Sequence, residues 1–116
     1  MQNKRKIIES YHKAWIKRDL RETLSFLMPD LYLKSPIDEF SGLDLFEQRC
    51  WPLGEALKGF IIRDFMESED KAFFTYDAIA GVGNFRCAEV FTFAGSKISA
   101  IDIYWGTIPK ASGEST

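Results

Sequence analysis

The chain has 116 residues, of which 46% are hydrophobic and 15% aromatic, and its formal net charge is −2 at pH 7. This length suits a single domain with a well-packed core, and the hydrophobic content argues against an intrinsically disordered chain. A slightly acidic chain lacks the basic surface that phosphate contacts require, so nucleic acid is not expected as a partner. No apolar run approaches the roughly 20 residues that cross a bilayer, and no signal peptide is visible, so we expect no membrane association and a cytoplasmic location.

Thiols and imidazoles are too few in this chain for a recognisable metal site. There are two cysteines, Cys50 and Cys87, and a single histidine, His12. The cysteine and histidine spacings typical of zinc sites are absent, so a zinc site is not expected. We also expect no other metal and no cofactor. Two buried thiols are the simplest expectation for the cysteines, and the sequence leaves a disulfide open.

The N-terminal part is expected to be helical. Apolar residues recur at three- and four-residue spacing over residues 3–18, which predicts an amphipathic helix with His12 on its exposed side. Asp19 is the expected N-cap of a second, short helix. A short strand over residues 31–35 follows, and it ends at Pro36 because proline cannot donate to a sheet ladder.

The middle of the chain changes from loop to helix to strand. Residues 36–42 are expected to form a polar loop, and residues 43–57 a third helix that Pro52 kinks or splits. Two strands follow over residues 60–67 and 72–80, where residues that favour strands are dense.

Residues 84–106 predict a hairpin with a turn at residues 94–96, which contain the glycine that such turns favour. Side chains alternate between the two faces of a strand. The first strand therefore places on one face Phe85, Cys87, Glu89, Phe91 and Phe93. The return strand is expected to place Ser99, Ile101, Ile103 and Trp105 on one face and Ile98, Ala100, Asp102 and Tyr104 on the other.

Glu89 is the exception on the most aromatic face of the chain. A carboxylate there is costly unless it is protonated, paired or exposed to a cavity. Two interpretations stay open. In one, Glu89 is a neutral acid that donates a hydrogen bond into a pocket, or is itself the acid/base. In the other, it is a pocket-lining carboxylate without a reaction, satisfied by Tyr11, Arg63, Arg86 or water.

The order of elements is helix, helix, short strand, helix and then four strands. This segregation predicts an α+β fold, in which a cone-shaped curved antiparallel sheet of four main strands and a short one wraps on three N-terminal helices. The open end of such a cone is an apolar pocket. We expect one domain over residues 1–109 and a disordered tail over residues 110–116.

Short motifs in a fixed order add a family resemblance. They are Tyr11…Trp15…Asp19-Leu20, Ser35-Pro36, Gly42-Leu43 and Phe91-Thr92-Phe93…Gly95-Ser96-Lys97-Ile98…Tyr104-Trp105. Over about residues 5–108 the chain resembles the nuclear transport factor 2-like superfamily, especially its SnoaL-like and ketosteroid isomerase-like branches. The resemblance implies the cone fold. It does not imply one activity, because the superfamily hosts isomerases, cyclases, dehydratases, hydrolases and non-catalytic modules.

The resemblance to ketosteroid isomerases implies roles for three positions. Tyr11 and Glu89 fall where those enzymes have a tyrosine and a protonated acid that form an oxyanion hole. The position of the proton-transferring base falls on Ser35. Serine cannot take a proton from carbon without an activating base. Either the base lies elsewhere, with Asp38 the nearest candidate, or the reaction is absent.

Two functional hypotheses follow. The first is a cofactor-independent isomerase, cyclase or lyase that acts on a small, flat, hydrophobic carbonyl compound, with Glu89, Tyr11 and Asp38 as catalytic residues. The second is a non-catalytic ligand-binding or dimeric assembly module that has lost the base. The residues expected to line the pocket and bind the ligand are Trp15, Phe26, Ser35, Phe60, Phe85, Cys87, Phe91, Ile101, Ile103 and Trp105.

The resemblance also implies an oligomer, because members of the superfamily usually pair through the outer face of the sheet. Here that face is expected to carry Arg86, Val90, Thr92, Asp102 and Tyr104. We therefore expect a homodimer through this surface.

Overall fold

The computed structural model describes residues 3–81 and 83–106, and the expected tail over residues 110–116 lies outside them. The helices are α1 (Lys4–Lys17), α2 (Leu20–Ser25) and a third helical segment built from α3 (Leu43–Leu45), η1 (Phe46–Cys50) and η2 (Trp51–Ala56). The strands are β1 (Leu27–Lys34), β2 (Glu39–Ser41), β3 (Leu57–Glu67), β4 (Lys71–Ala80), β5 (Gly83–Ala94) and β6 (Lys97–Trp105).

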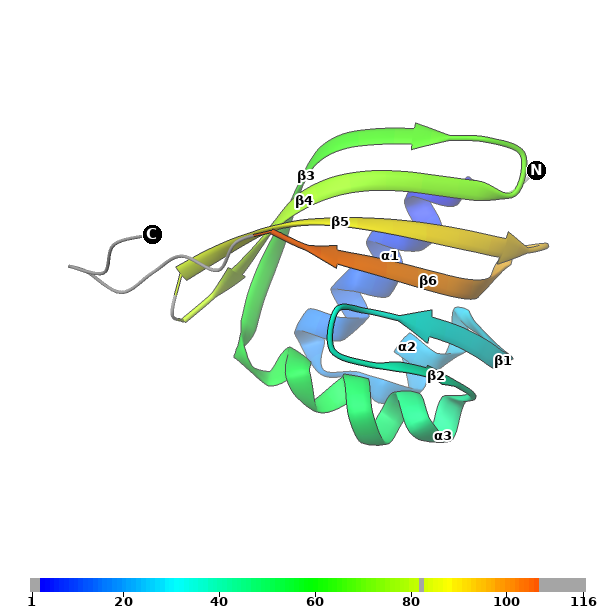
Figure 1. Cartoon of the computed structure of the whole chain (residues 1–116), viewed down its shortest axis with the longest axis horizontal. Coiled ribbons are helices and arrows are strands. Elements are labelled where there is room, and N and C mark those ends of the chain that lie inside the picture. Colours follow the sequence, from blue (N-terminus) through cyan, green and yellow to red (C-terminus); the bar gives the residue numbers. More distant parts are fainter. Residues whose placement is uncertain (1–2, 82, 107–116) are drawn as a thin grey trace.

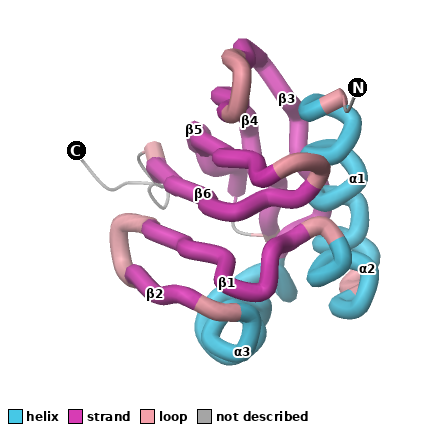
Figure 2. The backbone as a smooth tube through the Cα atoms, turned by 90° about the vertical axis from the view of Figure 1, so that its right-hand side faces the viewer, coloured by secondary structure: helices cyan, strands magenta, loops and turns pink. Residues whose placement is uncertain are grey.

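The described strands form one six-stranded sheet in the order β2-β1-β6-β5-β4-β3. Neighbouring strands are antiparallel except β1 and β6, which are parallel. The sheet is curved, and α1 crosses one of its faces while α3 lies at one end (Figure 1). A view turned by 90° shows α1 and α2 together on one side of the strands (Figure 2). The predicted α+β class, with a curved sheet on N-terminal helices, is confirmed, but the described sheet is mixed rather than antiparallel and has six strands rather than five.

The turn between α1 and α2 follows the expected chemistry. Arg18 adopts a left-handed conformation, with φ of 59°, and ends α1. Asp19 then accepts a hydrogen bond from the backbone N–H of Glu22 at 3.0 Å, as an N-cap should. The predicted cap is confirmed, and it fixes the direction in which the chain leaves α1.

The first part of the sheet is longer than predicted, because β1 begins at Leu27 and β2 occupies part of the expected loop. Pro29 lies where the pairing of β1 with β6 is interrupted, so its missing N–H removes no ladder bond. Phe40 of β2 is buried and pairs with Leu33. The mostly polar composition of residues 36–42 predicted a loop, but burial of Phe40 stabilises a short strand there.

The third helical segment runs without a break to Ala56 but changes its hydrogen bonding. Its middle turn, η1, is a π-helix, and the backbone N–H of Trp51 bonds to the carbonyl of Phe46. Pro52 then stands at the start of a 3₁₀ segment, η2. Proline lacks a donor for the continuing ladder, so the sequence accommodates it by changing helix type.

One face assignment in β6 is wrong. Ile98 is fully buried and pairs with Phe93, although strict alternation had placed it on the outer face. The register shifts next to this pair, and the hydroxyl of Ser99 donates to the carbonyl of Thr92 at 3.2 Å. A bulge of this kind inserts one extra residue, so Ile98 and Ile101 both point inward.

The core lies between α1 and the inner face of the sheet. Its fully buried side chains include Ile8, Leu31, Phe46, Phe91 and Ile101. Among residues 3–81 and 83–106, no helix is both long enough and apolar enough to cross a membrane.

Candidate functional site

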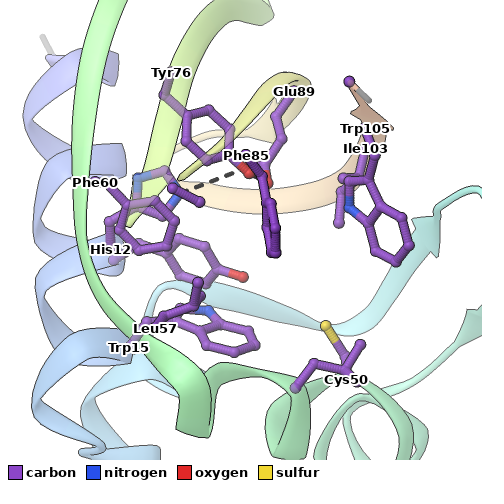
Figure 3. Close-up of a pocket in the computed structure, with 14 residues that line it drawn as sticks. His12, Trp15, Cys50, Leu57, Phe60, Tyr76, Phe85, Glu89, Ile103 and Trp105 are labelled. Carbon is purple, nitrogen blue, oxygen red and sulfur yellow. Dashed lines mark hydrogen bonds and ion pairs between the residues drawn. The ribbon is translucent and has the colours of Figure 1, made fainter. Parts of the chain in front are cut away.

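A cavity of about 270 Å³ lies between α1, the third helical segment and the inner face of the sheet. Figure 3 shows Glu89 and Tyr76 on the sheet side, His12 and Phe60 beside them, and Trp15 and Cys50 on the helical side. The expected pocket residues that line the cavity are Tyr11, Trp15, Phe60, Phe85, Glu89, Ile103 and Trp105. Lining residues that the sequence analysis did not assign to the pocket are His12, Cys50, Leu53, Leu57, Tyr76, Ala78 and Gly106.

Glu89 lies on β5 between two apolar cross-strand neighbours, Phe74 and Ile103. Only 7% of this residue is exposed. The hydroxyl of Tyr76 donates to its Oε2 at 2.6 Å. Its Oε1 is buried, has no hydrogen-bond partner among the described residues, and lies 3.6 Å from Nε2 of His12. The cavity therefore contains a carboxyl group with one oxygen fixed by the protein and one oxygen unpartnered.

His12 is buried, with 6% exposed, so the prediction that it faces solvent is wrong. Its ring stacks on Phe60, with ring centroids 4.2 Å apart. Position 12 is four residues after Ile8 and three before Trp15, which places it on the buried stripe of α1. This spacing was the sequence signal that could have identified His12 as buried. The curved sheet covers a wider part of the helix surface than the narrow apolar stripe predicts.

Tyr11 and Tyr76 supply hydroxyl groups in and beside the cavity. Burial, with the Cys50 and Glu89 groups nearby, raises the pKa of Tyr11 well above its ordinary value, and the Trp15 indole opposes this only in part. Burial and the Glu89 carboxyl likewise raise the pKa of Tyr76. Both phenols therefore keep their protons at neutral pH and can act as hydrogen-bond donors.

The helical wall of the cavity is held against α1 by Arg18. Its guanidinium lies 3.9 Å from the ring centroid of Trp51 and donates to the Trp51 carbonyl at 2.9 Å. Gly54 packs so closely against Trp15 and Arg18 that a Cβ there would overlap both side chains. Cys50, on the same wall, is buried, and this burial raises the pKa of its thiol to about 12. The thiol is therefore neutral under ordinary conditions and adds a polarisable, unreactive surface.

The structure does not bring Ser35 and Asp38 to the cavity. They lie in the loop between β1 and β2, where the Ser35 N–H donates to the Asp38 carbonyl at 2.8 Å. The Asp38 carboxylate is bound by the Arg49 guanidinium through two hydrogen bonds, one of them 2.9 Å long. These bonds hold the pKa of Asp38 below its ordinary value. An ionised, salt-bridged surface carboxylate is poorly placed to remove a proton from a ligand in the cone.

Other expected ligand-binding residues also lie outside the lining of the cavity. Phe91 and Ile101 are fully buried in the core, and Phe26 packs against that core from the end of α2. Cys87 contributes to a separate, more open groove that also contains Arg63 and Arg86. The alternation rule identified the correct face of β5 but not the depth along the strand at which packed core gives way to cavity.

Metal-ligand chemistry has little support within residues 3–81 and 83–106. No group of three or more histidine, cysteine, aspartate or glutamate side chains there is placed to hold a metal ion. That no cofactor is needed stays a prediction.

Structural relatives share the whole architecture at low sequence identity. An NTF2-like protein of unknown function from Cytophaga hutchinsonii has a TM-score of 0.74 and 12% identity, covering 91% of this chain and 92% of its own. The chain has the nuclear transport factor 2-like fold. A candidate ketosteroid isomerase from Kribbella flavida has a TM-score of 0.73 and 10% identity, covering 95% of this chain and 82% of its own.

A third similar structure argues against transferring an activity from fold alone. A de novo designed protein with a curved β-sheet has a TM-score of 0.79 and 14% identity, covering 91% of this chain and 88% of its own. No protein-family model and no curated protein matches the chain. The fold predicted from the sequence motifs is thus confirmed, and function must be argued from the residues of the cavity.

Proposed function

We propose that this protein binds a small, flat, hydrophobic carbonyl compound in the cone cavity and acts on it as a cofactor-independent isomerase, cyclase or lyase. The observation that carries the proposal is the buried, unpartnered Oε1 of Glu89 in a cavity that Tyr11 also lines. Buried polar groups in folded proteins are almost always hydrogen-bonded. A ligand oxygen is a partner that would complete this set of bonds.

The size and lining of the cavity support this ligand class. Its volume of about 270 Å³ lies just below the range of about 300–1,000 Å³ that is common for small-molecule sites, so the ligand is small. Aromatic rings, including those of Trp15, Phe85 and Trp105, supply flat apolar walls. Lysine and arginine are absent from the described lining, so an anionic tail buried in the cavity would lack a counter-charge.

The proposed chemistry is stabilisation of an enolate. Tyr11 and a neutral Glu89 each donate a hydrogen bond to the carbonyl oxygen of the ligand, and these bonds strengthen as negative charge develops on that oxygen. Tyr76 fixes Oε2, which leaves Oε1 to carry the donated proton. In a cavity with a mostly apolar lining, such donors act more strongly than they do in solution.

A second candidate is a non-catalytic ligand-binding or assembly module. The position of the isomerase base, Ser35, lies in a surface loop, and Asp38 is bound to Arg49. Neither residue lines the cavity. If no other group moves the proton, the cavity binds its ligand without turnover.

Binding of an enolate mimic tests the proposal. 4-Nitrophenol carries a hydroxyl group in the plane of its aromatic ring, whereas its methyl ether, 4-nitroanisole, has no O–H. We expect 4-nitrophenol to bind more tightly than 4-nitroanisole in calorimetric titrations. Glu89→Gln and Tyr11→Phe should each weaken the phenol by roughly tenfold or more while leaving the ether unchanged, because hydrogen bonds to charged or strongly polar partners contribute about 1.5–3 kcal/mol. If neither probe binds, the assembly module is favoured, and if both probes bind equally, the oxyanion site is wrong.

A further inference from the structure

The enolate chemistry requires a group that takes a proton from carbon, and His12 is placed for it. The chain has one histidine, and it lines the cavity. Histidine is the side chain that most often transfers protons in enzymes. Its Nε2 lies 3.6 Å from the unpartnered Oε1 of Glu89. The two groups of the cavity with the most suitable chemistry therefore face each other.

We infer that His12 is the proton-transferring residue of this site, working opposite Glu89. The inference rests on the proposed function and adds the base that the loop residues Ser35 and Asp38 do not provide. In the forward step, the C–H bond next to the ligand carbonyl breaks and its proton passes to Nε2 of His12. The electron pair of that bond forms the enolate, whose oxygen is held by Tyr11 and Glu89. Return of the same proton to another carbon completes an isomerisation without any co-reactant.

The separation of the two groups leaves both available to a ligand. At 3.6 Å, Nε2 and Oε1 are beyond ordinary hydrogen-bond distance, so the protein does not close the pair on itself. Nδ1 of His12 is also buried without a partner among the described residues. Neither ring nitrogen is therefore committed to a protein acceptor.

Neighbouring elements hold the imidazole in this position. Phe60 of β3 stacks on the ring, and Phe74 and Tyr76 of β4 lie with centroids 5.3 and 5.7 Å away. The titratable groups that line the cavity with His12 are the Glu89 carboxyl, the hydroxyls of Tyr76 and Tyr11, and the thiol of Cys50. These contacts fix the orientation of the ring opposite the Glu89 carboxyl.

The pair works as a unit in which the two groups carry different roles. The inference requires that the imidazole of His12 accepts a proton and that the carboxyl of Glu89 donates a hydrogen bond. After the transfer, the imidazolium faces the enolate, so the cavity as a whole remains neutral. A cavity without lysine or arginine in its described lining could not otherwise balance the enolate charge.

The position of the proton in the complex with 4-nitrophenol tests the inference. In this probe the O–H proton replaces the substrate C–H proton, and its transfer leaves a phenolate beside an imidazolium. At a pH where the free probe is mostly neutral, we expect the bound probe to show phenolate absorbance. We also expect the ¹⁵N signals of the only imidazole to move to those of an imidazolium. In His12→Gln the bound probe should lose the phenolate band.

The outcomes separate this inference from the proposed function. If calorimetry shows no preference for the phenol over 4-nitroanisole, the oxyanion site fails and the inference fails with it. If the phenol is preferred but stays neutral, with unchanged imidazole signals, only the role of His12 is overturned. Phenolate formation of equal extent in wild type and His12→Gln also overturns it. The ¹⁵N measurement uses the wild-type protein, so the test stands even if the variant does not fold.

Discussion

Tyr76 donates its hydroxyl proton to Glu89 Oε2 over 2.6 Å, from the strand that pairs with β5. This bond leaves Oε1 as the oxygen nearest His12. Burial and the Glu89 carboxyl raise the pKa of Tyr76 well above its ordinary value, so the phenol remains a donor through the neutral range. The orientation of the carboxyl in the cavity thus depends on a residue of β4.

Tyr76→Phe removes this donor and keeps the ring. We expect the free energy of unfolding to fall by about 1–3 kcal/mol, because a buried carboxyl oxygen loses its hydrogen-bond partner. Binding of 4-nitrophenol should weaken as well, since the carboxyl is no longer held. Urea unfolding followed by circular dichroism measures the first effect, and calorimetric titration measures the second.

Tyr104→Phe is the matched control for this change. Tyr104 is 55% exposed and donates to Asp102 at 2.9 Å on the outer side of the sheet. Removal of this surface hydroxyl should change the free energy of unfolding by no more than about 0.5 kcal/mol and leave probe binding unaltered. Equal effects of the two substitutions would show that the bond to Glu89 has no special weight.

Gly54→Ala tests how the helical wall of the cavity is held. An added Cβ would overlap the Trp15 ring and the Arg18 guanidinium, so the wall must shift away from α1. We expect a loss of about 1–3 kcal/mol in the free energy of unfolding, the usual cost of overpacking, together with weaker probe binding. Thermal unfolding and titration measure both quantities.

Gly81→Ala provides the comparison for this substitution, because an added Cβ at Gly81 would meet nothing within 4 Å. Its effect on the free energy of unfolding should be small or slightly stabilising. If Gly54→Ala has the same free energy of unfolding and probe affinity as wild type, Trp15 and Arg18 can move without an energetic penalty. The helical wall would then be mobile rather than fixed.

Glu89 and His12 mark how far the sequence predicts this site. Glu89 follows from a local rule, since strand alternation placed it on the inner face of β5, and it lies there. His12 has a local signal in its spacing from Ile8 and Trp15, but its burial also depends on how far the curved sheet wraps around α1. Ile98 faces inward only because of a bulge beside Ser99. The main helices and strands and the inner face of β5 were therefore predictable, whereas strand β2, the inward position of Ile98 and the depth of the cavity depend on non-local packing and were not.

Asp38→Asn tests whether the loop carboxylate takes part in the chemistry. Its hydrogen bonds to Arg49 hold the pKa of Asp38 below the ordinary value of 3.8. A carboxyl group whose pKa is lowered on folding stabilises the folded protein when the pH is above the ordinary pKa of that group. This contribution is lost as the pH falls through the folded-state pKa. We expect unchanged 4-nitrophenol binding and a difference in unfolding midpoint at neutral pH that disappears in acid. A loss of probe affinity would return Asp38 to the list of site residues.

Cys50→Ala should change the alkaline stability of the protein. Burial, with the nearby Glu89 and Asp38 carboxyls, raises the pKa of Cys50 from 9.0 to about 12. Between these values the unfolded chain binds fewer protons than the folded chain, so the free energy of unfolding falls as pH rises, by at most about 1.4 kcal/mol per pH unit. In Cys50→Ala the free energy of unfolding should fall less steeply with pH. Part of the fall should remain, because the pKa values of Tyr11 and Tyr76 are also raised in the folded protein.

Urea unfolding at a series of pH values from 8 upward measures this slope. Below the ordinary value of 9.0, wild type and Cys50→Ala should differ by a constant amount, which reflects packing alone. Parallel curves across the whole alkaline range would show that the thiol ionises equally in the folded and unfolded chain.

The homodimer expected through the outer face of the sheet stays a prediction, and the register supplies a precise test. Met66 pairs with Phe73 and Phe73 with Val90, so these side chains form a row across three strands. Met66 is 68% exposed and Phe73 40% exposed. Such a row of apolar side chains is typical of a surface that a partner covers. Phe73→Glu should convert a dimer into a monomer in sedimentation experiments.

Ile37→Glu is the control for the dimer, because Ile37 is 63% exposed but lies in the loop between β1 and β2. It adds the same charge in place of an exposed apolar side chain outside the row. The variant should sediment like wild type, since only a charge buried in the interface carries a desolvation cost. A wild-type protein that sediments as a monomer at every concentration, or two variants that dissociate equally, would mean that the outer face is not the interface.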